Sequence, residues 1–265
     1  MEDWRSYDSV AERYERVTAP RLSEPARDLV EATGVAPGLR VLDVGTGTGV
    51  AAGAAAARLG GQGLVVGVDV SLPMLRFARA RPGVLVAAAR AFDLPFRDGT
   101  FDVVLASFVI SHFPRPETGL FDMLRVLRSG GRLGVTNRGP GEDDLRRTWR
   151  ELVEAAVGSE LARSAVHQAV PWEERFADRP TLEEALERSG LRRVRSELRR
   201  YRFRYTIEEF VEERAASATG RFVREMLGEA AFAGFLERAR AAYRERFADP
   251  LTDLREVVLA VGTKP

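Results

Sequence analysis

The sequence predicts an α/β fold in which helices cover both faces of a doubly wound, mostly parallel sheet. Between residues 40 and 136, short apolar runs alternate with helical stretches, as in chains built of strand–helix–strand units. These runs are apolar throughout, which indicates strands that are buried on both faces. The chain has 265 residues, 45% of them hydrophobic, which is enough for one large domain of this kind.

The pattern also predicts where the elements of this region lie. We expect strands at residues 40–44, 64–69, 84–88, 101–107 and 132–136. We expect helices between them at residues 49–59, 73–81 and 117–127. Glycine-containing segments provide the connecting turns, and Ser-Gly-Gly at residues 129–131 should be the turn before the fifth strand.

Helical segments are expected on both sides of this core. Residues 4–33 place Trp4, Tyr7 and Tyr14 near helical spacing, and Pro20 should interrupt that helix. Beyond residue 136, we expect mainly helices, with strands at residues 191–205 and 254–262. The expected organisation is a helical lid (1–34), an α/β core (35–140), a helical cap insert (141–190) and a final part (191–265) that completes the same domain and holds a second helical insertion (206–250).

Composition excludes several classes of function. The formal net charge is +1, from 40 basic and 39 acidic residues, so nucleic acid or an anionic membrane is not expected as a partner. The chain has no cysteine and two histidines, which excludes thiolate catalysis and a Cys- or His-rich metal site. The charged start does not read as a signal peptide, and the longest apolar stretch, at residues 103–110, is too short to span a membrane. We therefore expect a soluble, cytoplasmic protein without a metal.

The most informative segment is Val-Leu-Asp-Val-Gly-Thr-Gly-Thr-Gly at residues 41–49, where a predicted strand enters a glycine-rich turn that opens a helix. The second strand ends in Asp69, and a carboxylate there can accept hydrogen bonds from both ribose hydroxyls of a nucleoside. Dinucleotide-binding domains share this layout, but they usually have a third glycine where this chain has Val50. Asp43, two residues before the first glycine, would be misplaced under a pyrophosphate and suits a cationic ligand.

Four segments, in order, resemble motifs of the class I S-adenosylmethionine-dependent methyltransferases. They are the glycine-rich segment, Asp69 followed by Met74, the run Phe-Asp-Leu-Pro-Phe-Arg-Asp-Gly-Thr-Phe-Asp at residues 92–102, and Met-Leu-Arg-Val-Leu-Arg-Ser-Gly-Gly at residues 123–131. The third run is similar to that of the quinone-type and small-molecule branch. The resemblance covers residues 35–137, and it implies a seven-stranded Rossmann-like sheet whose final strand is antiparallel.

The resemblance also implies a cofactor, S-adenosyl-L-methionine, with S-adenosyl-L-homocysteine as product, and a role for individual residues. The implied cofactor-binding residues are Asp43, Gly45, Thr46 and Gly47 near the methionine part, Asp69 at the ribose, Val70, Met74, Ala91 and Phe92 around the adenine, Ser107 near the methionine amine, and Tyr7 and Tyr14 in the lid. Arg90 departs from the family, which often has an aspartate there to accept from the adenine amine. An arginine cannot accept that hydrogen bond.

Two readings are open for His112, which follows the fourth strand. Its side chain can be a general base at neutral pH, or it can hold the loop by hydrogen bonding. His167 is expected at the surface, and Asp102 is expected to be structural. Seven arginines between residues 192 and 204, interleaved with aromatics, favour a charged edge strand over an RNA-binding surface, and attraction of an anionic substrate stays open.

The expected function is transfer of a methyl group to a small-molecule acceptor by in-line displacement. Carbon or oxygen is the favoured acceptor atom over nitrogen, and His112 is the candidate base. The principal alternative is a protein of this fold that binds S-adenosylmethionine without methylating, such as a cyclase or a regulatory module. A nicotinamide-dependent oxidoreductase is disfavoured by Val50. The substrate and the oligomeric state are not predicted.

Overall fold

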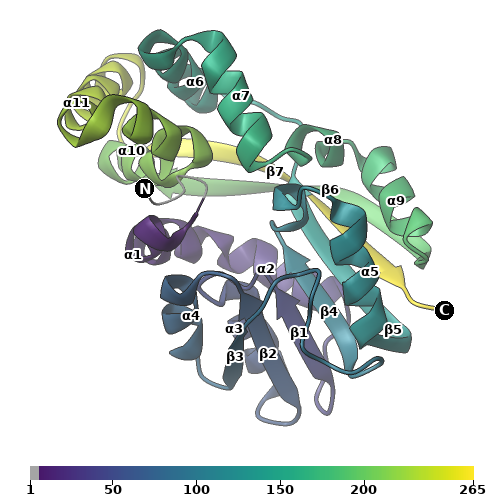
Figure 1. Cartoon of the computed structure of the whole chain (residues 1–265). Helices are drawn as coiled ribbons and strands as arrows, with labels where there is room; N and C mark the ends of the chain where they lie inside the picture. Colours follow the sequence, from purple (N-terminus) through teal and green to yellow (C-terminus); the bar gives the residue numbers. More distant parts are fainter. Residues whose placement is uncertain (1–5) are drawn as a thin grey trace.

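Within residues 6–265, which the computed structural model of this chain describes, seven strands form one sheet in the order β3-β2-β1-β4-β5-β7-β6 (Figure 1). The strands are β1 (Arg40–Val44), β2 (Leu64–Asp69), β3 (Val84–Ala88), β4 (Phe101–Ser107), β5 (Leu127–Arg138), β6 (Arg192–Tyr205) and β7 (Leu251–Thr263). β7 pairs antiparallel with β5 and β6, whereas the other pairs are parallel. The predicted doubly wound, mostly parallel sheet with an antiparallel last strand is confirmed.

Helices cover both faces of the sheet, as the uniformly apolar strands require. On one face lie α2 (Ser23–Ala32), α3 (Val50–Leu59) and α4 (Leu72–Arg79), and on the other lie α5 (Pro116–Val126), α8 (Glu173–Ala177) and α9 (Arg179–Arg188). Successive residues of β1 alternate between the two cores, with Val41 packed against α2 and α3 and Leu42 against α5 and α9. Of the predicted insert at residues 141–190, the part from Phe176 onward therefore packs against the sheet.

The remaining helices gather beyond one end of the sheet (Figure 1). They are α6 (Asp144–Val157), α7 (Ser159–Ala169), α10 (Ile207–Ala216) and α11 (Ala218–Arg246), the last broken at Gly228. Their core includes Tyr201, Phe203 and Tyr205 of β6, while the arginines between them point to solvent. This alternation confirms the prediction of a charged edge strand at residues 192–204. Across residues 6–265, no helix is both long and apolar enough to cross a membrane.

The N-terminal segment is helical from Asp8 to Ala32, but not as one regular helix. α1 (Ala11–Arg13) continues into a π-helical turn at Tyr14–Thr18 and a 3₁₀ turn at Ala19–Leu22 before α2 begins. The sequence predicts that Pro20 interrupts the helix, but the chain stays helical and only tightens into the 3₁₀ turn there. Pro20 lies at the start of this turn, where a backbone N–H would be unpaired in any case, so its missing N–H breaks no hydrogen bond. Trp4 of the predicted helix lies outside the described residues.

The predicted turn at residues 129–131 is wrong, because these residues lie inside β5. Gly130 donates a hydrogen bond to the Lys264 carbonyl at 2.8 Å, and Lys264 donates one to the Gly131 carbonyl at 2.9 Å. The register between β4 and β5 shifts between Phe101 and Val103. The two glycines therefore form an irregularity within a paired strand.

Candidate functional site

A cleft of about 570 Å³ lies at the carboxyl ends of β1, β2 and β4, where the strand order reverses between β1 and β4. Ligands of open α/β sheets bind at such a switch point. The site residues predicted from the sequence that line the cleft are Tyr7, Tyr14, Gly45, Gly47, Asp69, Val70, Met74, Ala91, Phe92, Ser107 and His112. Asp43 and Thr46 are not among the residues that line it.

The loop between β1 and α3 brings backbone close to this cleft. Gly45 has a φ of +67°, in the left-handed region that favours glycine, and a Cβ atom there would collide with the Val109 side chain. Gly47 has a φ of +54°, and a Cβ there would meet no atom within 4 Å. The loop is thus closely packed on the Val109 side and open at Gly47.

Asp69 ends β2 and connects the two loops that border the cleft. Its Oδ2 accepts a hydrogen bond from the N–H of Gly47 at 2.8 Å, and its Oδ1 accepts one from the N–H of Ser71 at 2.9 Å. Burial raises the pKa of this carboxyl, although the backbone N–H groups oppose the shift. A carboxyl group therefore lies where the sequence predicted the ribose-binding acid.

Asp43 and Thr46 lie buried beneath the glycine loop and bind each other. The Thr46 hydroxyl donates to Oδ2 of Asp43 at 2.7 Å, and the N–H of Ala52 donates to the same oxygen at 3.0 Å. Oδ1 of Asp43 is buried without a hydrogen-bond partner, and burial raises the pKa of this carboxyl to about 7. The pair supports the glycine loop from beneath, and Oδ1 of Asp43 does not reach the cleft.

Val70 and Phe92 form an exposed apolar border of the cleft. Their side chains are 68% and 51% exposed, whereas Met74 is buried. Apolar groups exposed beside a cleft suit a flat apolar ligand. The guanidinium of Arg90 lies 5.8 Å from the centre of the Phe92 ring, so this edge offers donors where the resemblance would place an acid.

A smaller cavity of about 210 Å³ adjoins the cleft, and Tyr7, Tyr14, Phe108 and His112 line both. Its other walls come from the ends of β5 and β7 and from α7, α10 and the start of α11. Polar and charged side chains line part of this cavity, including Asn137, Arg138, Glu173, Glu213, Arg214, Thr219 and Arg255. A ligand in the cleft and a ligand in the smaller cavity would therefore meet at the four shared side chains.

His112 lies at this junction. Its ring centre is 5.7 Å from that of Tyr7 in an edge-on arrangement. Burial lowers the pKa of the imidazole below its ordinary value of 6.5, and Arg221 lowers it further, while Glu173 opposes the shift. The ring is therefore neutral at pH 7 and able to accept a proton.

Tyr7 and Tyr14 cover the junction from the N-terminal segment. Their ring centres are 6.0 Å apart in an edge-on arrangement, and the Arg221 guanidinium lies 4.2 Å from the centre of the Tyr7 ring. Arg221 belongs to α11, so this contact joins the predicted lid to the second helical insertion, predicted at residues 206–250.

Phe108 is a site residue that the sequence did not predict. It follows β4 with a φ of 54°, which is rare for a residue with a side chain. Its N–H donates to the Thr136 carbonyl at 3.0 Å, which turns the chain end toward β5. Gln168 and Ala169 of α7 also line the cleft, and no local sequence signal distinguishes them from other helical residues.

His167 and Asp102 lie outside the cleft and the smaller cavity. His167 is exposed on α7, as expected. Asp102 accepts a hydrogen bond from the N–H of Arg40 at 2.7 Å and pairs with Arg128, which confirms its structural role. Among residues 6–265, no group of three or more His, Asp or Glu side chains is arranged to hold a metal ion.

Comparisons with known proteins agree with this geometry. A methyltransferase domain family model matches residues 42–135. A demethylmenaquinone methyltransferase from Renibacterium salmoninarum is 41% identical over 167 residues, which cover 60% of this chain and 68% of that protein. Nocamycin O-methyltransferase from Saccharothrix syringae is 34% identical over 173 residues, covering 62% and 61%. The YcgJ protein from Bacillus subtilis has a similar fold, with a TM-score of 0.59, 19% identity, and coverage of 91% of this chain and 98% of that one.

Proposed function

Because this chain belongs to the class I S-adenosylmethionine-dependent methyltransferases, we propose that it transfers a methyl group to carbon or oxygen of a small molecule in the smaller cavity. The observation that carries the proposal is the junction itself. A cleft at the sheet's switch point and a separate cavity meet at His112, Phe108 and the two tyrosines. This arrangement would bring two bound molecules together in a defined orientation.

The residues of the cleft fit the cofactor. Asp69 would accept hydrogen bonds from the ribose hydroxyls, and Val70 and Phe92 would flank the adenine. The open side of Gly47 would admit the methionine part, and Asp43 would act through the loop that it supports from beneath. When bound, the cofactor supplies an electrophilic methyl group on a sulfonium, which makes its thioether a good leaving group.

The residues at the junction would position the acceptor and take its proton. Phe108 and Tyr14 form apolar walls that orient the acceptor and exclude water. Neutral His112 would accept the proton of an enol or phenol as the new bond to carbon or oxygen forms. Methylation of carbon is supported by a relative named ubiquinone/menaquinone biosynthesis C-methyltransferase UbiE, from Ectopseudomonas mendocina, and methylation of oxygen by the nocamycin relative.

Methyl transfer from labelled S-adenosylmethionine tests this proposal directly. The full chain is incubated with the methyl-labelled cofactor and a panel of phenols, enols and reduced quinones, and both S-adenosylhomocysteine and labelled product are quantified by mass spectrometry. We expect equal amounts of the two products with at least one acceptor, and much less of both with His112→Gln. Tight cofactor binding without transfer to any acceptor would favour the non-methylating alternative.

A further inference from the structure

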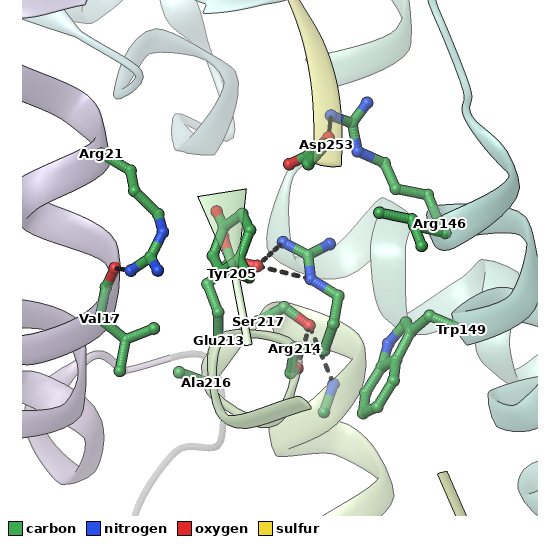
Figure 2. Close-up of polar contacts among 12 residues, drawn as sticks. Val17, Arg21, Arg146, Trp149, Tyr205, Glu213, Arg214, Ala216, Ser217 and Asp253 are labelled. Carbon is green, nitrogen blue, oxygen red and sulfur yellow. Dashed lines mark hydrogen bonds and ion pairs between the residues drawn. The ribbon is translucent and has the colours of Figure 1, made fainter. Parts of the chain in front are cut away.

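Part of the wall of the smaller cavity is rich in arginine, which cofactor binding does not explain. Arg255 of β7 and Arg214 of α10 line it, and they are only 5% and 6% exposed. Both pair with Glu213, which is also buried: the Arg214 Nε donates to this carboxylate at 2.7 Å, and Arg255 Nη2 lies 3.4 Å from it. Figure 2 shows Arg214 and Glu213 in contact beside Tyr205, with Val17 and Arg21 of the N-terminal segment on one side and Arg146 and Trp149 of α6 on the other.

These groups stay charged. The neighbouring carboxylates, Glu213 first, raise the pKa of Arg255 against the effect of burial, and Glu213 likewise raises that of Arg214. The two arginines lower the pKa of Glu213, and Arg255 and Arg146 lower that of Asp253 to about 2. The wall therefore carries fixed guanidinium charges at any pH at which the protein is folded.

The arginines have more donors than the protein uses. A guanidinium has five N–H groups. Arg255 makes its hydrogen bonds through Nη2, which donates to Asp253 at 2.6 Å and also to Tyr205 and Glu213, so its Nη1 donates to no group in the described part of the chain. Its Nε also has no partner, but it is fully buried and out of reach of a ligand. Arg214 binds Glu213 through Nε and Nη2, so within residues 6–265 its Nη1 also donates to no protein group.

The carboxylates of the same wall are already engaged. Glu213 is held by both arginines, and Glu173 lies 3.6 Å from Arg138. The N–H groups that remain unpaired on this wall therefore belong to cationic side chains, and such groups bind oxyanions. A neutral apolar acceptor would cover these donors without satisfying them, which opposes binding.

The wall that the cavity shares with the cleft has a different character, because the rings of Tyr7, Tyr14, Phe108 and His112 line it. From these two sets of side chains we propose that the methyl acceptor is a small aromatic carboxylate, whose carboxylate binds Arg214 and Arg255 while its ring lies against Phe108 and His112. The proposal rests on the methyltransferase function proposed above. It adds a requirement for negative charge on the acceptor, placed away from the atom that is methylated.

The test compares aromatic acids with their neutral amides on the full chain. The protein is saturated with S-adenosylhomocysteine and titrated calorimetrically with benzoate, 4-hydroxybenzoate and 1-naphthoate, each paired with its amide. We expect at least one acid to bind about tenfold or more tightly than its amide, as a charge-assisted pair with arginine requires. Arg214→Gln should remove this preference and Arg214→Lys should restore part of it.

Arg146→Gln is the matched control, because Arg146 is a buried arginine of the same network that pairs with Asp253 but does not line the cavity. It should keep the preference for acids, and circular dichroism establishes that each variant is folded. Equal affinity for every acid and its amide, or no binding of either, in protein that binds S-adenosylhomocysteine would overturn the proposal. Absent binding of S-adenosylhomocysteine would instead refute the function on which it rests. If a variant does not fold, the comparison of acids with their amides on the wild-type chain tests the proposal by itself.

Discussion

Replacing Asp69 with asparagine should weaken cofactor binding in addition to its cost to the fold. The carboxylate accepts from Gly47 N–H at 2.8 Å and from Ser71 N–H at 2.9 Å, and an asparagine can keep only one of these contacts. It also loses the charge that strengthens the hydrogen bonds from the ribose. Hydrogen bonds to charged groups contribute about 1.5–3 kcal/mol each, so we expect a loss of about 2–3 kcal/mol. This corresponds to an increase of about 30- to 150-fold in the dissociation constant.

Calorimetric titration with S-adenosylhomocysteine measures this change, and Asp102→Asn is the control. Asp102 also accepts from a backbone N–H, that of Arg40 at 2.7 Å, but it begins β4 at the opposite end of the sheet from the cleft. We expect both variants to lose similar stability and only Asp69→Asn to lose affinity. If Asp69→Asn binds as tightly as the wild type, or if Asp102→Asn loses as much affinity, the ribose assignment is refuted.

Other predictions test the junction and the loop. His112→Gln should lower kcat by about 100-fold without changing the affinity for S-adenosylhomocysteine, and unchanged turnover would exclude His112 as the base. The kcat of the wild type should be constant above pH 7 and fall in acid, where the imidazole, whose pKa is lowered, becomes protonated. The folded-state pKa of Asp43 is raised to about 7, so the ligand-free protein should lose stability as pH rises from about 4 to 7, and Asp43→Asn should flatten this dependence in urea unfolding. Gly45→Ala should cost about 1–3 kcal/mol of unfolding free energy, and Val109→Ala should recover part of it because the added Cβ collides with Val109; additive losses would contradict this reading.

The sequence predicted the sheet closely because its strands carry a strong local signal. A strand covered on both faces needs an unbroken apolar run, and the runs that end in Val44, Asp69 and Ser107 stop where the structure ends β1, β2 and β4. The error at residues 129–131 has a clear cause. Two glycines indicate a turn locally, but pairing with Lys264, far along the chain, draws them into β5.

The site was predicted where local motifs determine it and missed where tertiary contacts do. Asp69 was predicted from the end of an apolar strand and Gly45 from a glycine-rich turn, and both features are local patterns of the sequence. Phe108 has a positive φ, and no residue-type pattern predicts such a conformation in a phenylalanine. The arginine wall combines residues of α10 and β7 that are about 40 positions apart, so only the fold reveals that they meet.

The central claim is that the cleft at the ends of β1, β2 and β4 binds S-adenosylmethionine. The most direct measurement is calorimetric titration of the wild-type chain with S-adenosylmethionine, S-adenosylhomocysteine and NAD. The account predicts that the first two bind one molecule per chain with micromolar affinity and that NAD does not bind. Binding of NAD, or no binding of S-adenosylmethionine and S-adenosylhomocysteine, would contradict it.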